Sequence, residues 1–94
     1  MGREVTLFTF PSTYYALKAE KLLKEKGFQG WLIPMPKEIS SLCGLALEIE
    51  TVEEEKIWPV LSSAVKLEKK VKAVKTRGFL ERILEVVELS TPPE

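Results

Sequence analysis

Several residue types are missing from this sequence, and their absence narrows its chemistry. There is no histidine, so catalysis by an imidazole is excluded. The chain has one cysteine, Cys43, which rules out an internal disulfide. Without histidine or a second cysteine we expect no metal site, and we expect no cofactor. Aspartate and asparagine are also absent, and Gln29 is the only side-chain amide, a bias typical of proteins selected for heat resistance.

The chain also lacks net charge and long apolar runs. Lysine and arginine number 14, as do the acids, so there is no overall attraction to nucleic acid or anionic lipid. No apolar run is long enough to cross a bilayer, and the first residues do not resemble a secretory signal. We therefore expect a cytoplasmic protein without a membrane partner. Its length of 94 residues predicts one domain over residues 1–90, followed by a disordered tail at 91–94.

Hydrophobic periodicity divides the chain into strands and helices. Alternating or continuous apolar patterns predict four strands, at Glu4–Phe10, Trp31–Ile33, Gly44–Glu50 and Val71–Thr76. Helical spacing predicts three helices: one from Ser12 or Thr13 to about Lys26, one opened by the capping-box pair Thr51 and Glu54, and one over Phe79–Leu89. Both faces of the first strand are largely apolar, which favours a central position in the sheet. Gly27 ends the first helix, and Pro59 must kink the second or displace its regular part.

The order of these elements predicts an α+β fold. Its first six elements match a ferredoxin-like split β-α-β sandwich (βαββαβ), with an additional C-terminal helix. In that plan the third strand lies antiparallel between the first two, so the first helix begins at the sheet end that holds the loop before the third strand. Cys43 is therefore expected near Phe10–Thr13. The C-terminal helix covers either the second face of the sheet or a second copy of the chain, and we favour a homodimer.

Cys43 is the candidate reactive residue. A thiol near a helix start ionises more readily than a free one, and the thiolate is the form that accepts sulfur. Neighbouring hydroxyls could hold a sulfur anion, and a glycine directly after the cysteine allows close backbone approach. The predicted binding residues are Ser12, Thr13, Tyr14, Ser40, Ser41 and Gly44. The alternative is that Cys43 is a small, inert, buried side chain, and that Tyr14 is a surface residue.

Two segments make the sequence similar to a known family. One is Phe-Pro-Ser-Thr at residues 10–13, leading into the helical run at 16–23. The other is Ile-Pro-Met-Pro-Lys-Glu-Ile-Ser-Ser-Leu-Cys-Gly-Leu-Ala-Leu at residues 33–47, in which the prolines, the Lys-Glu-Ile-Ser-Ser run and Cys-Gly fall in order. Over roughly Thr9–Glu50 the chain resembles the selenium/sulfur carrier-like proteins, which are small domains built around one cysteine.

The resemblance implies a function for Cys43. It would accept a persulfide sulfur or a selenium atom from a donor protein, such as a cysteine desulfurase, and pass it to an acceptor enzyme. Such a protein transfers an atom stoichiometrically and need not be an enzyme. In the family pattern a histidine often follows the Ser-Thr pair, whereas Tyr14 and Tyr15 follow here, so no imidazole can relay the proton. The alternative is a small ligand- or protein-binding regulatory module in which Cys43 is structural.

A basic stretch precedes the C-terminal segment. It contains Lys66, Lys69, Lys70, Lys72, Lys75 and Arg77, interrupted by Glu68 alone. This stretch is interpreted either as a contact for RNA or an acidic protein, or as an edge strand that its lysines protect against aggregation. Because no aromatic residue lies within it and the net charge is zero, we favour the edge strand over nucleic-acid binding. Trp31 and Trp58 mark either an interface or core packing.

Overall fold

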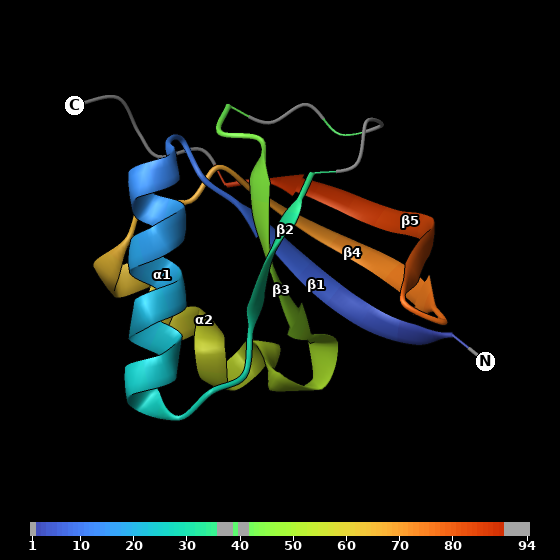
Figure 1. The fold of residues 1–94 in the computed structure, drawn as a ribbon, viewed down its shortest axis with the longest axis horizontal. Coiled ribbons are helices and arrows are strands. Elements are labelled where there is room, and N and C mark those ends of the chain that lie inside the picture. Colours follow the sequence, from blue (N-terminus) through green and yellow to red (C-terminus); the bar gives the residue numbers. More distant parts are fainter. Residues whose placement is uncertain (1, 36–38, 40–41, 90–94) are drawn as a thin grey trace.

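The computed structural model describes residues 2–35, 39 and 42–89, and within them it has a five-stranded antiparallel sheet and two α-helices (Figure 1). The strands lie side by side in the order β2-β3-β1-β4-β5. Their bounds are β1 Arg3–Thr9, β2 Trp31–Pro34, β3 Leu45–Glu50, β4 Lys69–Thr76 and β5 Phe79–Glu88. The helices are α1 Thr13–Lys26 and α2 Glu54–Ala64, with the 3₁₀ turn η1 Thr51–Glu53 before α2. The predicted α+β class is confirmed.

The first strand occupies the middle of the sheet, as predicted. It pairs with β3 on one side and β4 on the other, and its residues from Val5 onward are buried. Alternate side chains enter two separate apolar clusters: Phe8 lies on the side of the helices, and Val5 and Leu7 lie on the opposite side. A strand with two buried faces needs apolar residues at successive positions, which explains its composition.

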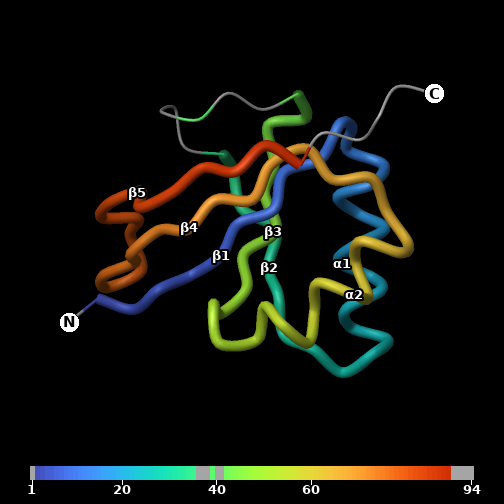
Figure 2. The backbone as a smooth tube through the Cα atoms, turned by 180° about the vertical axis from the view of Figure 1, so that it is seen from behind, coloured from blue at the N-terminus to red at the C-terminus, as the bar shows by residue number. Residues whose placement is uncertain are grey.

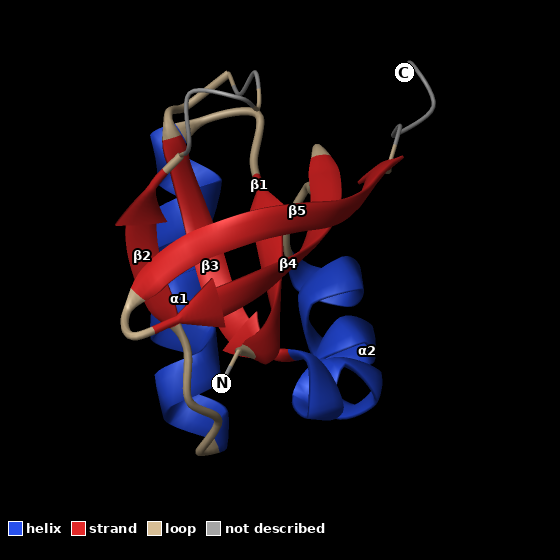
Figure 3. Ribbon diagram, turned by 90° about the vertical axis from the view of Figure 1, so that its right-hand side faces the viewer, coloured by secondary structure: helices blue, strands red, loops and turns tan. Residues whose placement is uncertain are grey.

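Both helices cover one face of the sheet (Figure 3). Ala16, Ala19 and Leu23 form the buried stripe of α1 against that face. Gly27 ends the helix in the left-handed conformation, at φ 83°, as its position predicts. None of the described helices is long and apolar enough to span a membrane.

The start of α2 differs from the predicted capping box. The N-cap residues are Glu50 for η1 and Glu53 for α2, neither with a side-chain cap hydrogen bond, whereas Thr51 and Glu54 both bind Thr6 of β1. The two threonine hydroxyls lie 3.0 Å apart, and Thr6 donates to a Glu54 carboxylate oxygen at 3.0 Å. Burial raises the pKa of Glu54, but hydrogen bonds from Lys70 and Thr6 outweigh it, so the pKa lies below its usual value. Thr51 and Glu54 therefore connect the start of α2 to β1 of the sheet.

The predicted C-terminal helix is wrong, because residues 79–88 form β5. Two bulges in β5 explain the error, because the β4–β5 register skips Glu81 and Leu84. As a result, the β5 residues opposite Lys75, Ala73 and Val71 lie three positions apart. These residues are Leu80, Ile83 and Val86. A spacing of three imitates a helix although the backbone is extended.

The second face of the sheet is covered by strand and loop rather than by a helix. Leu80 and Ile83 of β5 and Ile39 of the loop before β3 pack over a cluster that includes Leu7 and Val71. Figure 3 shows β5 curling across this face. The same arrangement makes β4 an internal strand, so the prediction that the lysine stretch is a sheet edge is wrong.

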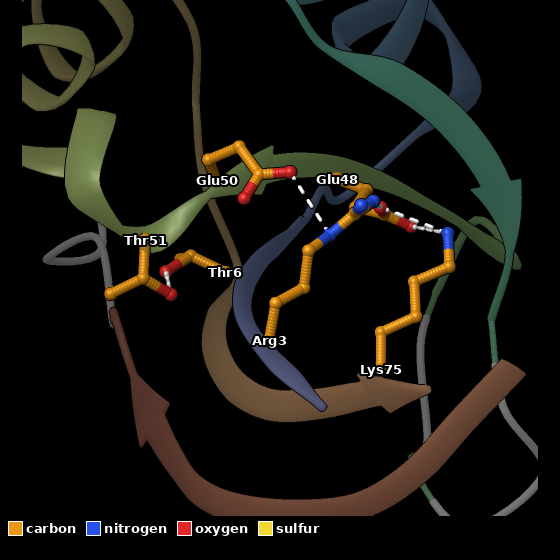
Figure 4. A network of polar contacts seen from close by, with 6 residues as sticks. All are labelled: Arg3, Thr6, Glu48, Glu50, Thr51 and Lys75. Carbon is orange, nitrogen blue, oxygen red and sulfur yellow. Dashed lines mark hydrogen bonds and ion pairs between the residues drawn. The ribbon is translucent and has the colours of Figure 1, made fainter. Parts of the chain in front are cut away.

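A buried ion pair lies among the strands (Figure 4). The Glu48 carboxylate accepts two hydrogen bonds from Lys75 Nζ, at 2.8 and 2.9 Å. The Arg3 guanidinium lies 3.8 Å from Glu48 and 3.1 Å from Glu50. Lys70 likewise pairs with Glu54 at 2.7 Å. Several lysines of the basic stretch therefore neutralise acids within the fold.

The β4–β5 turn offers a test of backbone conformation. Arg77 and Gly78 have φ values of 53° and 86°, which is the two-residue hairpin turn that favours Asn-Gly. Arg77→Asn is therefore expected to raise the free energy of unfolding by about 0.5–1 kcal/mol, because asparagine tolerates positive φ better than arginine. Urea unfolding followed by circular dichroism measures the change. A decrease in the free energy of unfolding would show that a contact of the Arg77 side chain stabilises the fold by more than its positive φ costs.

Candidate functional site

The loop that carries Cys43 lies at the end of the sheet where α1 begins. β1 ends at Thr9, α1 begins at Thr13, and β3 begins at Leu45. Figures 1 and 2 both place these three points at the same end of the molecule. This arrangement follows from β3 lying antiparallel between β1 and β2. The topology therefore brings the elements together as expected.

Cys43 is half-buried at the start of β3, and its sulfur is held by its own chain. Its side chain packs on the helix-side core cluster, which contains Phe10. The thiol donates to the Leu45 carbonyl oxygen at 3.3 Å, and the Leu45 N–H donates to Sγ at 3.4 Å. Only the N–H bond can persist when the sulfur is an anion, because a carbonyl oxygen cannot donate. One backbone donor is thus already placed at Sγ.

Gly44 has a different role from the one expected. Its φ is 76°, and a Cβ added there would meet nothing within 4 Å. The glycine is therefore needed for the left-handed conformation rather than for close backbone approach. Its carbonyl accepts a hydrogen bond from Met35 N–H at 2.9 Å, which closes the base of the loop.

The other predicted site residues contact Cys43 less than expected. Within the described part of the chain, the hydrogen bonds of Cys43 go to Leu45 and not to Ser12, Thr13 or Tyr14. Ser12 occupies the N-cap position without a side-chain cap bond, and Thr13 is exposed. Tyr14 is 63% exposed, and its ring packs edge-on against Tyr15 at 5.1 Å. Ser40 and Ser41 lie outside the described residues.

Glu68 is a residue of the site that sequence reasoning missed. Its Oε1 accepts hydrogen bonds from the Thr9 hydroxyl at 3.0 Å and from the Leu42 N–H at 3.3 Å. Its own N–H donates to the Thr9 carbonyl, and its carbonyl accepts from Leu89 N–H. Glu68 therefore joins the end of β1 to the residue before Cys43. One feature of the sequence could have indicated its role: Glu68 is the one acid inside the lysine stretch.

Comparison with known protein families gives a match to this sequence. The model of the family described as "Putative Se/S carrier protein-like" matches residues 6–71, well over half of the chain. The chain belongs to that family. The matched part of this family member runs from β1 to the start of β4 and includes Cys43, whereas β5 lies outside it. No curated protein and no solved structure gives a significant match.

Proposed function

We propose that this protein carries sulfur or selenium on Cys43 between a donor protein and an acceptor enzyme. Membership of the carrier family supports this function, and the match spans the chain's one thiol. The position of Cys43 also fits. It is half-buried at the end of the loop before β3, and the Leu45 N–H donates a hydrogen bond to its sulfur. A carrier needs a thiol that a partner can reach and a surrounding that tolerates a sulfur anion.

The proposed transfer consists of two thiol–persulfide exchanges. In the first, the Cys43 thiolate attacks the terminal sulfur of the donor persulfide; a new S–S bond forms, the S–S bond of the donor breaks, and the donor leaves as a thiolate. The proton of the Cys43 thiol passes to water, because the chain has no histidine to accept it. In the second exchange an acceptor thiolate attacks the terminal sulfur, and Cys43 leaves as the thiolate. A selenium atom would take the place of the terminal sulfur.

Mass spectrometry after incubation with a cysteine desulfurase and free cysteine tests the proposal. The protein is expected to gain one sulfur atom, the gain should disappear on reduction, and Cys43→Ser should gain nothing. The control is a sample whose Cys43 has been alkylated beforehand. If the thiol alkylates readily under the same conditions but takes up no sulfur, the carrier function is wrong.

One observation favours the second candidate, a binding module in which Cys43 is structural. The thiol proton is already used in a hydrogen bond to the Leu45 carbonyl. Alkylation separates the two functions. A carrier cysteine reacts in the folded protein below pH 8, whereas a structural cysteine reacts only after denaturation.

A further inference from the structure

A groove between α1 and α2 remains unexplained by the transfer chemistry. Its volume is about 490 Å³, and its walls include Tyr15 of α1 and Trp58 of α2. Leu67 and Leu89 lie among its apolar lining, and two serines of α2 add hydroxyls. This is enough room for one or two apolar side chains of another molecule. Cys43 does not line the groove, so it is a separate surface feature.

Trp58 is packed against the sheet on one side and open to this groove on the other. It is 36% exposed, and its ring stacks on the buried ring of Phe8, with centroids 6.1 Å apart and an interplanar angle of 27°. A half-exposed aromatic side chain that already packs on a buried ring loses less conformational entropy when a partner covers it than a fully exposed one. Such residues are typical anchors of protein interfaces.

The charge at the groove is of one sign. Lys18 and Lys66 line it and are exposed, and no carboxylate of the described residues is among its lining. The chain as a whole has no net charge, so this positive character is local. A matching surface would present carboxylates around an apolar side chain, because opposite charges at the rim of an interface steer association.

The groove also lies next to the loop of Cys43. Leu67 and Leu89 both adjoin Glu68: one precedes it in the chain, and the other donates its N–H to the Glu68 carbonyl. The carboxylate of Glu68 in turn holds the N–H of Leu42, whose side chain is 73% exposed beside Cys43. The groove is therefore joined through Glu68 to the loop that carries the thiol.

We propose that this groove docks the protein that delivers sulfur to Cys43, through an apolar side chain of that donor flanked by carboxylates. This inference rests on the proposed carrier function and adds the surface and the chemistry of the partner. Docking in the groove orients the donor persulfide toward the Cys43 loop. The lysines attract the donor, and Trp58 and Tyr15 receive its apolar side chain.

Charge reversal tests the groove. In the double variant Lys18→Glu, Lys66→Glu, the concentration of cysteine desulfurase that gives half-maximal loading of Cys43 is expected to rise about tenfold at low salt, and less at high salt. The matched control is Lys21→Glu, Lys24→Glu, which makes the same change of charge on exposed positions of α1 outside the groove. The control should load like the unaltered protein. Loading from glutathione persulfide is measured in every variant, because this small donor reports on Cys43 without docking.

The outcomes separate this inference from the proposed function. A rise in the groove variant alone, relative to loading from glutathione persulfide, supports docking at the groove. Equal loading of all three proteins by the desulfurase overturns it, as does an equal rise in both double variants, which would indicate only a general effect of charge. Failure of the unaltered protein to load from the desulfurase while it loads from glutathione persulfide also overturns the inferred donor. Failure to load from either source contradicts the carrier function itself.

Discussion

Replacing Lys75 with methionine is expected to lower the free energy of unfolding by about 3 kcal/mol. The side chain of Glu48 is 2% exposed, and Lys75 Nζ donates two short hydrogen bonds to its carboxylate. Methionine keeps the length of the lysine side chain but removes the charge, so the carboxylate stays buried and, among the described residues, keeps an ion pair with Arg3 alone, at 3.8 Å. Urea unfolding followed by tryptophan fluorescence measures the loss. It should be large because burying an unpaired charge costs more than a buried pair contributes.

Two further variants show whether the unpaired charge is the cause. Lys56→Met changes an exposed lysine of α2 and should alter stability by no more than about 0.5 kcal/mol. The double variant Glu48→Leu, Lys75→Met removes both charges and should recover most of the loss, since apolar side chains can replace a buried pair. A double variant as unstable as Lys75→Met alone would show that packing, and not charge, determines the effect.

Most of the elements in this fold could be predicted from local patterns. The largely apolar character of both faces of the segment from Val5 to Phe10 indicated a central strand, and β1 is the central strand. Gly27 indicated the end of α1, and it adopts the left-handed conformation there. These features depend on residues close together in the chain, which is why the sequence alone was sufficient.

β5 could not be predicted in the same way. Its two bulges place Leu80, Ile83 and Val86, the partners of alternate β4 residues, at intervals of three, so the period that normally distinguishes a strand from a helix is lost. The turn before it, Arg77-Gly78, has only one residue of the usual turn chemistry. An extended conformation here depends on pairing with β4, which no local pattern reports.

The burial of Glu48 and the role of Glu68 are long-range effects. Alternation along β3 placed Leu45, Leu47 and Ile49 on one face and predicted nothing about what covers the other. Glu48 is buried because Lys75, 27 positions later, reaches it across the sheet. Glu68 contacts Leu42 across 26 positions for the same kind of reason. The topology could place Cys43 at the correct end of the sheet, but not identify the side chain that anchors its loop.

Replacing Glu68 with alanine is expected to raise the alkylation rate of Cys43 in the folded protein about tenfold. A factor of ten corresponds to a loss of about 1.4 kcal/mol of loop stabilisation. Hydrogen bonds to a charged group contribute about 1.5–3 kcal/mol, so the loss of the bonds to Glu68 is large enough. Glu68 Oε1 holds both the Thr9 hydroxyl and the Leu42 N–H. Without that oxygen, the residue next to Cys43 loses its bond to the body of the protein, and the half-buried thiol is exposed more often. Mass spectrometry of iodoacetamide-treated protein over time measures the rate.

Glu68→Gln distinguishes the hydrogen bonds from the charge. Glutamine keeps a side-chain oxygen in the same place but removes the negative charge. The alkylation rate of Cys43 should therefore stay within about twofold of the rate in the unaltered protein if the bonds to Thr9 and Leu42 restrain the loop. Glu55→Ala, which removes an exposed carboxylate from α2, serves as the matched control and should have no effect. Equal acceleration in the alanine and glutamine variants would mean that the charge of Glu68, and not its hold on Leu42, limits the reactivity of Cys43. An unchanged rate in both would mean that the loop is restrained by other contacts, such as the bond between Met35 and Gly44 at its base.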